Sequence, residues 1–171
     1  MEILIPGLII VALMVYASTR IKRSAAAAFD SEAIETDEFV INKPEGFLNN
    51  LNGDPKFALE AYSREYGVAA TDLRAGRVAL TIRPASSIAI EVPRIMETDG
   101  EIVEDLSEMI GSHHYRLIET RRTDKTAECV VTYKLAENNS KVYILEAVRL
   151  SETSDEFAGN LDAFVASFEL K

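Results

Sequence analysis

The sequence begins with an uncharged, mostly apolar run at residues 3–19, and Arg20, Lys22 and Arg23 follow it directly. Residues 8–15, at the centre of the run, are apolar on every face of a helix, which suits lipid better than a half-solvated protein surface. A run of about 17 residues lies at the short end of the range that crosses a hydrocarbon core. The run therefore predicts a single transmembrane helix, so that residues 1–23 form an anchor with a basic flank.

A cleaved secretory signal is the main alternative to an anchor. Such a signal has positive charge before its apolar run and a small-residue cleavage site after it. Here Glu2 precedes the run and the basic residues follow it, although cleavage near Ala27, within the alanines at 25–28, would release a secreted domain. Lys and Arg flanking a span stay in the cytoplasm. The charge placement therefore favours an anchor with its N-terminus outside and the domain cytoplasmic.

The remainder of the chain is acidic, and this composition limits its partners. The 171 residues carry a formal net charge of −10, and the part after Arg23 is more acidic still because three basic residues lie in the flank. Nucleic acid is an unsuitable partner, since phosphate binding needs a basic face. The length after the anchor fits one domain and a tether. The single cysteine, Cys129, cannot form an internal disulfide, which agrees with a reducing compartment.

The chain after the anchor divides into a tether and a domain. Residues 24–37 form the tether. Its first half is alanine-rich and could prolong the preceding helix as far as Phe29, and its second half is acidic without an apolar period, which predicts a solvated, poorly ordered segment. Residues 38–171 form the domain. Apolar and polar residues alternate at 39–42, 57–62 and 77–83, a pattern typical of strands, and a shorter run at 88–92 ends at Pro93.

A helix is predicted next. Thr98 and Glu101 have the spacing of a capping box, and Gly111 is a suitable C-terminal stop. Between them, apolar residues recur on one helical face, at Ile102, Val103, Leu106, Met109 and Ile110.

Three strands and a closing helix complete the domain. The pattern at residues 115–120, 127–135 and 142–150 predicts a meander, with a tight turn at 138–140, and the last strand is apolar on both faces, as in a central strand. Thr153 and Glu156 repeat the capping-box spacing. The inner face of the helix is aromatic, with Phe157, Leu161, Phe164, Val165 and Phe168. This order of elements predicts an α+β domain with helices packed on an antiparallel sheet.

The domain resembles the PsbP/Mog1-like superfamily, including its bacterial relatives of unknown function. Residues 39–47 look like the first strand of that family, followed by a Pro-x-Gly-aromatic turn, although Phe47 stands where the family usually has tryptophan. Residues 157–169 look like the closing helix. The resemblance implies a sheet sandwiched by helices, without a shared catalytic centre, in a family whose known members bind or help assemble other proteins.

The candidate site residues favour structural roles. His113 and His114 are adjacent, so on a strand they point to opposite faces and make a poor metal chelate. Cys129 lies on the apolar face of its strand, which indicates a core residue and not a nucleophile. Asp99, Glu101, Glu104 and Asp105 lack the spacing of a calcium loop, so we expect a solvated acidic helix turn. The glycines form no phosphate-binding motif, and the serines form no nucleophile elbow.

Two function classes follow from the sequence. The first is a non-enzymatic, membrane-tethered protein-binding or assembly domain on the cytoplasmic face, with no cofactor, no metal and no catalytic residue. The second is an enzyme or small-ligand-binding domain whose pocket the sequence does not reveal. A deep pocket with convergent polar groups would favour the second class.

Overall fold

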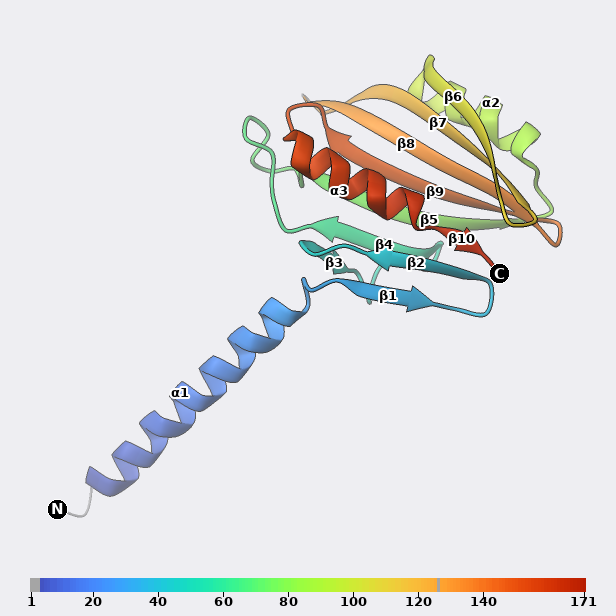
Figure 1. The fold of residues 1–171 in the computed structure, drawn as a ribbon. Helices are drawn as coiled ribbons and strands as arrows, with labels where there is room; N and C mark the ends of the chain where they lie inside the picture. The colour runs from blue at the N-terminus through green and yellow to red at the C-terminus, as the bar shows by residue number, and fades with distance from the viewer. Residues whose placement is uncertain (1–3, 126) are drawn as a thin grey trace.

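The computed structural model describes residues 4–125 and 127–171, with side chains from residue 10 onward. Within these residues the chain forms three helices and ten strands (Figure 1). Their order is α1 (Leu4–Ala27), β1 (Glu32–Glu35), β2 (Phe39–Lys43), β3 (Phe47–Asn49), β4 (Phe57–Ser63), β5 (Gly76–Pro84), α2 (Ile88–Asp99), β6 (Ile102–Ile110), β7 (His113–Asp124), β8 (Ala127–Asn138), β9 (Lys141–Leu150), α3 (Asp155–Ala166) and β10 (Glu169–Leu170).

The strands form two antiparallel sheets. The larger has the order β3-β4-β5-β9-β8-β7-β6, and the smaller has the order β1-β2-β10. The predicted α+β class is confirmed, as is the meander β7-β8-β9. Strand β9 lies between β5 and β8, as its apolar pattern predicted. The turn between β8 and β9 contains Asn139 and Ser140 at positive φ (51° and 60°), a conformation that asparagine tolerates.

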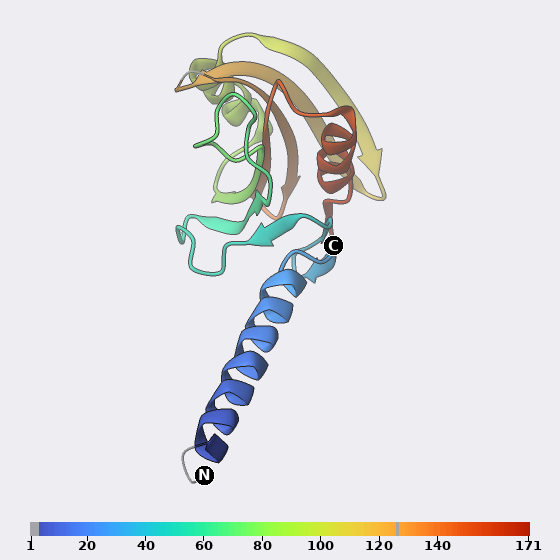
Figure 2. The ribbon, with the colours of Figure 1, turned by 90° about the vertical axis from the view of Figure 1, so that its left-hand side faces the viewer.

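Helices α2 and α3 cover opposite faces of the larger sheet. Successive side chains of β9 alternate between them: Tyr143 and Leu145 belong to the core cluster that includes α3, whereas Ile144 belongs to the cluster that includes α2. Figure 2 shows the larger sheet curving over α3. The predicted sandwich of helices around a sheet is therefore present.

The core beneath α3 is aromatic. Phe47 stacks near Phe157 and meets Phe164 edge-on, with ring centroids 5.8 and 5.5 Å apart. Phe168 lies against Phe39 and Tyr115, with centroids 6.0 and 6.3 Å apart. These contacts confirm the predicted aromatic face of the closing helix for Phe157 and Phe164. Phe168 was predicted on the same helix, but α3 ends at Ala166 and Phe168 lies in the connection to β10. The helix begins one residue later than predicted, because Ser154 and not Thr153 accepts the capping hydrogen bond, from the Phe157 N–H.

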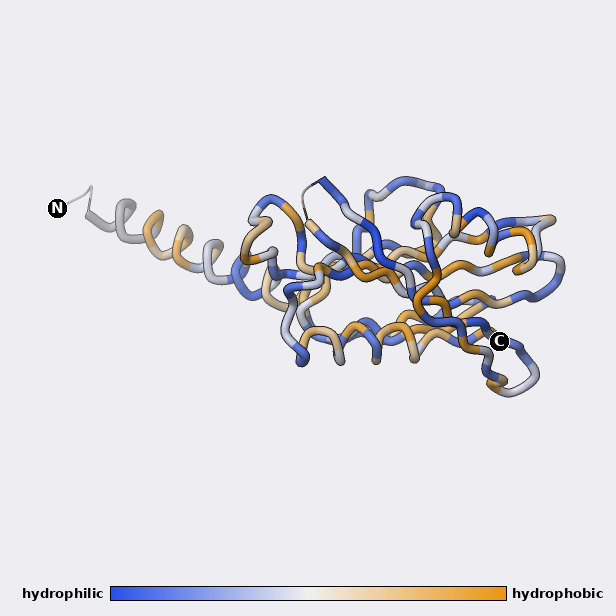
Figure 3. Tube along the Cα trace, turned by 90° about the horizontal axis from the view of Figure 1, so that it is seen from above, coloured by the Kyte–Doolittle hydropathy of each residue, from blue (hydrophilic) through white to orange (hydrophobic). Residues whose placement is uncertain are grey.

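Helix α1 projects from the domain without packing against it (Figures 1 and 2). Its described apolar side chains are exposed, including Met14 and Ile21, and Figure 3 shows the apolar turns giving way to a hydrophilic stretch. Among the described residues, no helix is both long enough and apolar enough to span a membrane. Arg20, Lys22 and Arg23 continue the same helix, and residue 3 of the predicted span lies outside the described part. The predicted transmembrane anchor is thus not supported.

The predicted tether is wrong in its second half. Residues 32–35 form β1, which pairs with β2 in the register Glu32↔Lys43 to Glu35↔Val40. The Lys43 ammonium is buried and donates to the carbonyl oxygens of Asp30 and Phe47. The Gly46 N–H donates to the Phe29 carbonyl at 2.8 Å. These bonds order an acidic segment that has little apolar surface of its own.

The structure also corrects two predicted elements next to each other in sequence. The segment predicted as a short strand is helix α2, and the segment predicted as a helix is strand β6. Helix α2 buries Ile88, Val92 and Ile95 at helical spacing, and Glu137 on β8 accepts a hydrogen bond from the Ile88 N–H. Strand β6 is exposed over most of its length, so its sequence does not alternate. Gly111, at φ +61°, belongs to the hairpin turn that follows.

We expect Phe168→Ala to lower the free energy of unfolding by about 3–5 kcal/mol, because the ring is fully buried between Phe39 and Tyr115. Urea denaturation of the variant and the parent measures the change. Leu51→Ala, at a side chain that is 91% exposed, is the matched control and should change the free energy by less than about 0.5 kcal/mol. A loss below about 1 kcal/mol for Phe168→Ala would contradict the packing described.

We expect a fragment of residues 28–171 to be more stable than a fragment of residues 36–171. The shorter fragment lacks β1 and the Asp30 carbonyl, so the buried Lys43 loses one of its acceptors. An unmade hydrogen bond of a buried polar group costs about 1–3 kcal/mol. Urea denaturation of both fragments tests this, and equal midpoints would show that the segment before Thr36 adds nothing to the fold.

Candidate functional site

Cys129 is a core residue, as predicted. Its side chain is 2% exposed and packs with Ala70 and Leu150. Burial raises the pKa of the thiol, which keeps it protonated and disfavours the thiolate that a nucleophile requires.

The two histidines lie at the start of β7. His113 pairs with Ile110 and His114 with Met109 across the β6–β7 hairpin. As neighbours on one strand they point to opposite faces. Among the described residues, no group of three or more His, Cys, Asp or Glu side chains is placed to hold a metal ion.

The predicted solvated acidic turn is wrong for Asp99. This residue ends α2, and its side chain is fully buried. Its carboxylate accepts hydrogen bonds from Thr120 Oγ1 (2.8 Å), Tyr133 OH (2.7 Å) and Arg122 Nη1 (2.9 Å). Burial, with the nearby carboxylates, raises the pKa of Tyr133 well above its usual range, so the phenol remains a donor. Asp99 therefore docks the end of α2 on the sheet.

The other three acidic residues of that segment are exposed and separate from Asp99. Glu101 lies between α2 and β6, and Glu104 and Asp105 lie on β6. Only Asp105 has a close ion-pair partner among the described residues, Arg116 on β7 at 2.6 Å. The four carboxylates are thus not one site.

An ion-pair network lies on the same face of the larger sheet as α2, over the part of that face that α2 does not cover. Arg122 links Asp99 to Glu146 (3.1 Å), and Arg77 links Glu146 (3.8 Å) to Glu60 (2.7 Å). Each carboxylate already accepts from a guanidinium. Such mutual pairing fits a structural role better than proton transfer, which needs a group poised to change its charge. No motif in the sequence indicated this network, because its members come from α2 and four different strands.

A pocket of about 290 Å³ lies beside this network, at the strand ends next to the loop between β4 and β5. Its lining includes Cys129 and four arginines, Arg74, Arg77, Arg122 and Arg149. Three of the four guanidinium groups are already engaged, since Arg74 donates to the Ser63 and Arg64 carbonyls and Arg77 and Arg122 belong to the network. The pocket has the charge to receive a small anion, but most of its donors are not free to converge on one.

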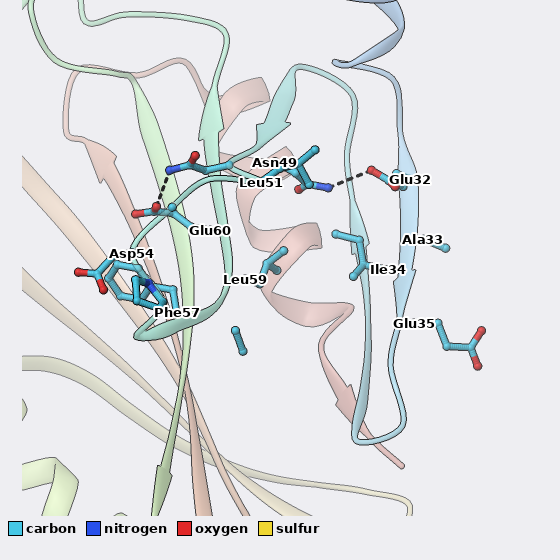
Figure 4. Close-up of a pocket in the computed structure, with 14 residues that line it drawn as sticks. Glu32, Ala33, Ile34, Glu35, Asn49, Leu51, Asp54, Phe57, Leu59 and Glu60 are labelled. Carbon is cyan, nitrogen blue, oxygen red and sulfur yellow. Dashed lines mark hydrogen bonds between the residues drawn. The ribbon is translucent and has the colours of Figure 1, made fainter.

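A larger and more open groove, of about 700 Å³, lies between the smaller sheet and the loop that joins β3 to β4 (Figure 4). Its apolar lining comes from Ile34 on β1, Leu51 in the loop, and Phe57 and Leu59 on β4. Leu51 is 91% exposed, whereas Leu59 is buried. The apolar residues of the groove therefore range from the almost fully exposed Leu51 to the buried Leu59.

Carboxylates lie at the rim of this apolar surface. Glu32 comes from β1 and Asp54 from the loop, and Glu32 accepts a hydrogen bond from Asn49 Nδ2 at 2.9 Å. Figure 4 shows this bond, and it also shows the Glu35 side chain of β1 pointing away from the groove. Glu35 pairs with Lys171 (3.0 Å) and Asp54 with Lys56 (2.9 Å), in exposed ion pairs of small energy. Asn49 Oδ1 is buried and accepts no hydrogen bond from the described residues. The groove can thus receive cationic groups at its rim and an N–H donor at its inner end.

The sequence alone did not reveal this groove. Its two walls are β1, which was predicted to be disordered, and a loop recognised only by its Asn, Gly, Asp and Pro residues. The unusual exposure of Leu51 becomes visible only once the loop is placed.

Comparison with known proteins places the fold. No protein-family model matches the chain, and no curated protein matches it in sequence. Among solved structures, cyanobacterial PsbP (CyanoP) from Synechocystis superposes with a TM-score of 0.57 at 11% identity, covering 85% of this chain and 94% of that one.

The Ran-binding protein Mog1p from Saccharomyces cerevisiae superposes with a TM-score of 0.53 at 12% identity, covering 83% of this chain and 96% of that one. A mutant form of Mog1 gives a TM-score of 0.54, with the same identity and coverage of 82% and 96%. At these identities the likeness concerns the fold and not the activity. The resemblance predicted from residues 39–47 and 157–169 is confirmed at that level: the chain has the fold shared by PsbP and Mog1.

Proposed function

We propose that the domain is a non-enzymatic protein-binding module, and that the groove beside β1 receives a segment of the partner carrying an apolar residue flanked by basic ones. The observation that carries the proposal is the pairing of an exposed leucine, Leu51, with an open groove that has an apolar strip and carries Glu32 and Asp54 at its rim. Open apolar patches with polar rims mark protein-interaction sites. The net charge of −10 also favours a cationic partner, and it acts over a longer range than the carboxylates of the groove.

Two further points support protein binding. The charged side chains on the open sheet face are already paired with one another, which leaves a poor set of groups for acid–base chemistry. One structure with the same fold, Mog1p, is described as a Ran-binding protein, which is a precedent for the fold and not for the partner. Binding of a small anion in the arginine-lined pocket is the alternative, and it is favoured only by the four arginines there.

A photo-crosslinking amino acid at position 51 tests the proposal in cells. We expect a discrete crosslinked protein, because Leu51 lies in the proposed contact. The same amino acid at Val68 is the matched control, since Val68 is a comparably exposed apolar residue (85%) in a different loop. Glu32→Lys combined with Asp54→Lys should reduce the yield about tenfold by reversing the charge of the rim.

Equal crosslinking at both positions, or none at position 51, would contradict the proposed groove. Turnover of a small molecule by the purified chain would favour the enzyme class instead.

We also propose that the domain lies on the cytoplasmic side. The single cysteine, Cys129, is buried and unpaired, which suits a reducing compartment. Protease added to intact spheroplasts should therefore leave the domain whole, and protease added after lysis should digest it. Digestion in intact spheroplasts would place the domain outside.

A further inference from the structure

Strand β6 (Ile102–Ile110) is the longer of the two edge strands of the larger sheet, the other being β3. Strand β6 pairs with β7 on one side only, and no described strand pairs with its other side. Figure 2 shows β6 at the outer rim of the curved sheet. Residues 103–109 are all exposed, so neither face of the strand is covered as the other long strands are. In an antiparallel pair, every second residue directs its N–H and C=O away from the partner strand. Strand β6 therefore offers a row of backbone donors and acceptors to another chain.

The side chains of β6 that face α3 combine charge with an apolar centre. Glu104, Leu106 and Glu108 lie on this face, where they border a groove of about 330 Å³. The groove also contains Glu119 from β7 and Asp162 from α3. Of these carboxylates, only Glu108 approaches a described basic group, Lys134 Nζ at 3.4 Å. The face beside the free edge is thus acidic, apolar and acidic at successive positions along the strand.

The opposite face of β6 is apolar at both ends. Val103 is 53% exposed and Met109 is 64% exposed, and between them Asp105 is paired with Arg116. A strand laid along the edge would cover Val103 and Met109 with its own side chains. It would also meet Leu106, which is 53% exposed, on the α3 side. Long apolar edge strands are a liability unless they are protected, and here the protection is charge.

We propose that β6 binds an extended segment of a partner protein by strand addition, and that the segment has a basic, apolar, basic pattern at every second residue. Its basic side chains lie beside Glu104 and Glu108, and its apolar side chain lies beside Leu106. Backbone hydrogen bonds to β6 supply affinity, while the alternate side chains supply selectivity. This surface differs from the groove beside β1, and the inference rests on the proposed function only in assigning a protein partner to the domain.

A second copy of the chain does not fit this edge. Antiparallel pairing of two β6 strands centred on Leu106 would place Glu104 of one copy opposite Glu108 of the other. Like charges directly opposite each other on paired strands are destabilising. Parallel pairing would likewise bring identical carboxylates together. The carboxylates therefore reject self-association and select a cationic strand.

The test uses the full chain and a synthetic nine-residue peptide, the length of β6, with lysine and valine alternating on one face and threonine on the other. Fluorescence anisotropy of the labelled peptide should give saturable binding that weakens as salt rises. A peptide with glutamate in place of lysine is the control for charge and should not bind. Two further peptides carry N-methyl groups on alternate backbone amides. The peptide methylated on the edge that meets β6 should lose binding, and the peptide methylated on the outer edge should keep it.

Substitutions in the chain locate the contact. Glu104→Gln with Glu108→Gln should weaken binding about fivefold, since each cross-strand charge pair contributes roughly 0.2–1 kcal/mol. Glu65→Gln with Glu128→Gln removes two exposed carboxylates outside the groove and should change binding less than about twofold. The two N-methylated peptides are compared on the unaltered chain, so that comparison does not depend on how the variants fold.

The possible outcomes separate this inference from the proposed function. Equal binding by the two N-methylated peptides, or no binding by the lysine peptide, would overturn strand addition at β6. Crosslinking from position 51 would still stand in that case, because it reports on a different surface. If position 51 gave no crosslink and the peptide methylated on its outer edge bound while the other did not, the groove would be rejected as the binding site and β6 would remain.

Discussion

The aromatic packing beneath α3 is the interaction on which the rest of the domain depends. It joins residues from the beginning of the domain, Phe39 and Phe47, to residues from its end, Phe164 and Phe168. The Tyr115 hydroxyl accepts a hydrogen bond from the Leu170 N–H at 2.7 Å, so the last strand is also fixed to the meander. Because β10 pairs with β2, this closure positions the smaller sheet against the larger one. The groove beside β1 exists only because the two sheets are held in this way.

The elements that could be predicted from sequence are those whose own pattern decides their structure. Strands β5, β8 and β9 alternate or are apolar throughout because they lie inside the sheet, and α3 carries apolar residues at helical spacing because one face is in the core. The turn at Asn139 follows from local backbone preference. In each case the element is stabilised by burial or by a backbone preference that also appears as a local pattern in the sequence.

The errors occurred where distant residues decide the structure. Helix α2 depends on Glu137, 49 positions from Ile88, and on Arg83, which pairs with the buried Glu91 at 2.8 Å. Strand β6 lacks the alternation of apolar and polar residues because both of its faces are exposed, and the helical spacing of its apolar residues is accidental. Strand β1 is ordered by pairing with β2 and by the contacts of the segment before it with Lys43. The same reasoning explains the candidate site: Asp99 finds its partners 21 to 34 positions away, and the groove is bounded by segments with no shared motif.

The connection between α1 and the domain determines how the molecule would respond to mechanical load. A pull along α1 enters the domain at Phe29 and Asp30, whose carbonyl groups are held by Gly46 and Lys43. The next structure in its path is β1, which is bound to the domain mainly through β2. Strand β1 can detach while the aromatic core stays closed, because none of its residues belongs to that core and only Ile34 packs against it. Detachment would remove one wall of the groove. Tension on the helix would therefore dismantle the candidate binding site before it unfolded the domain.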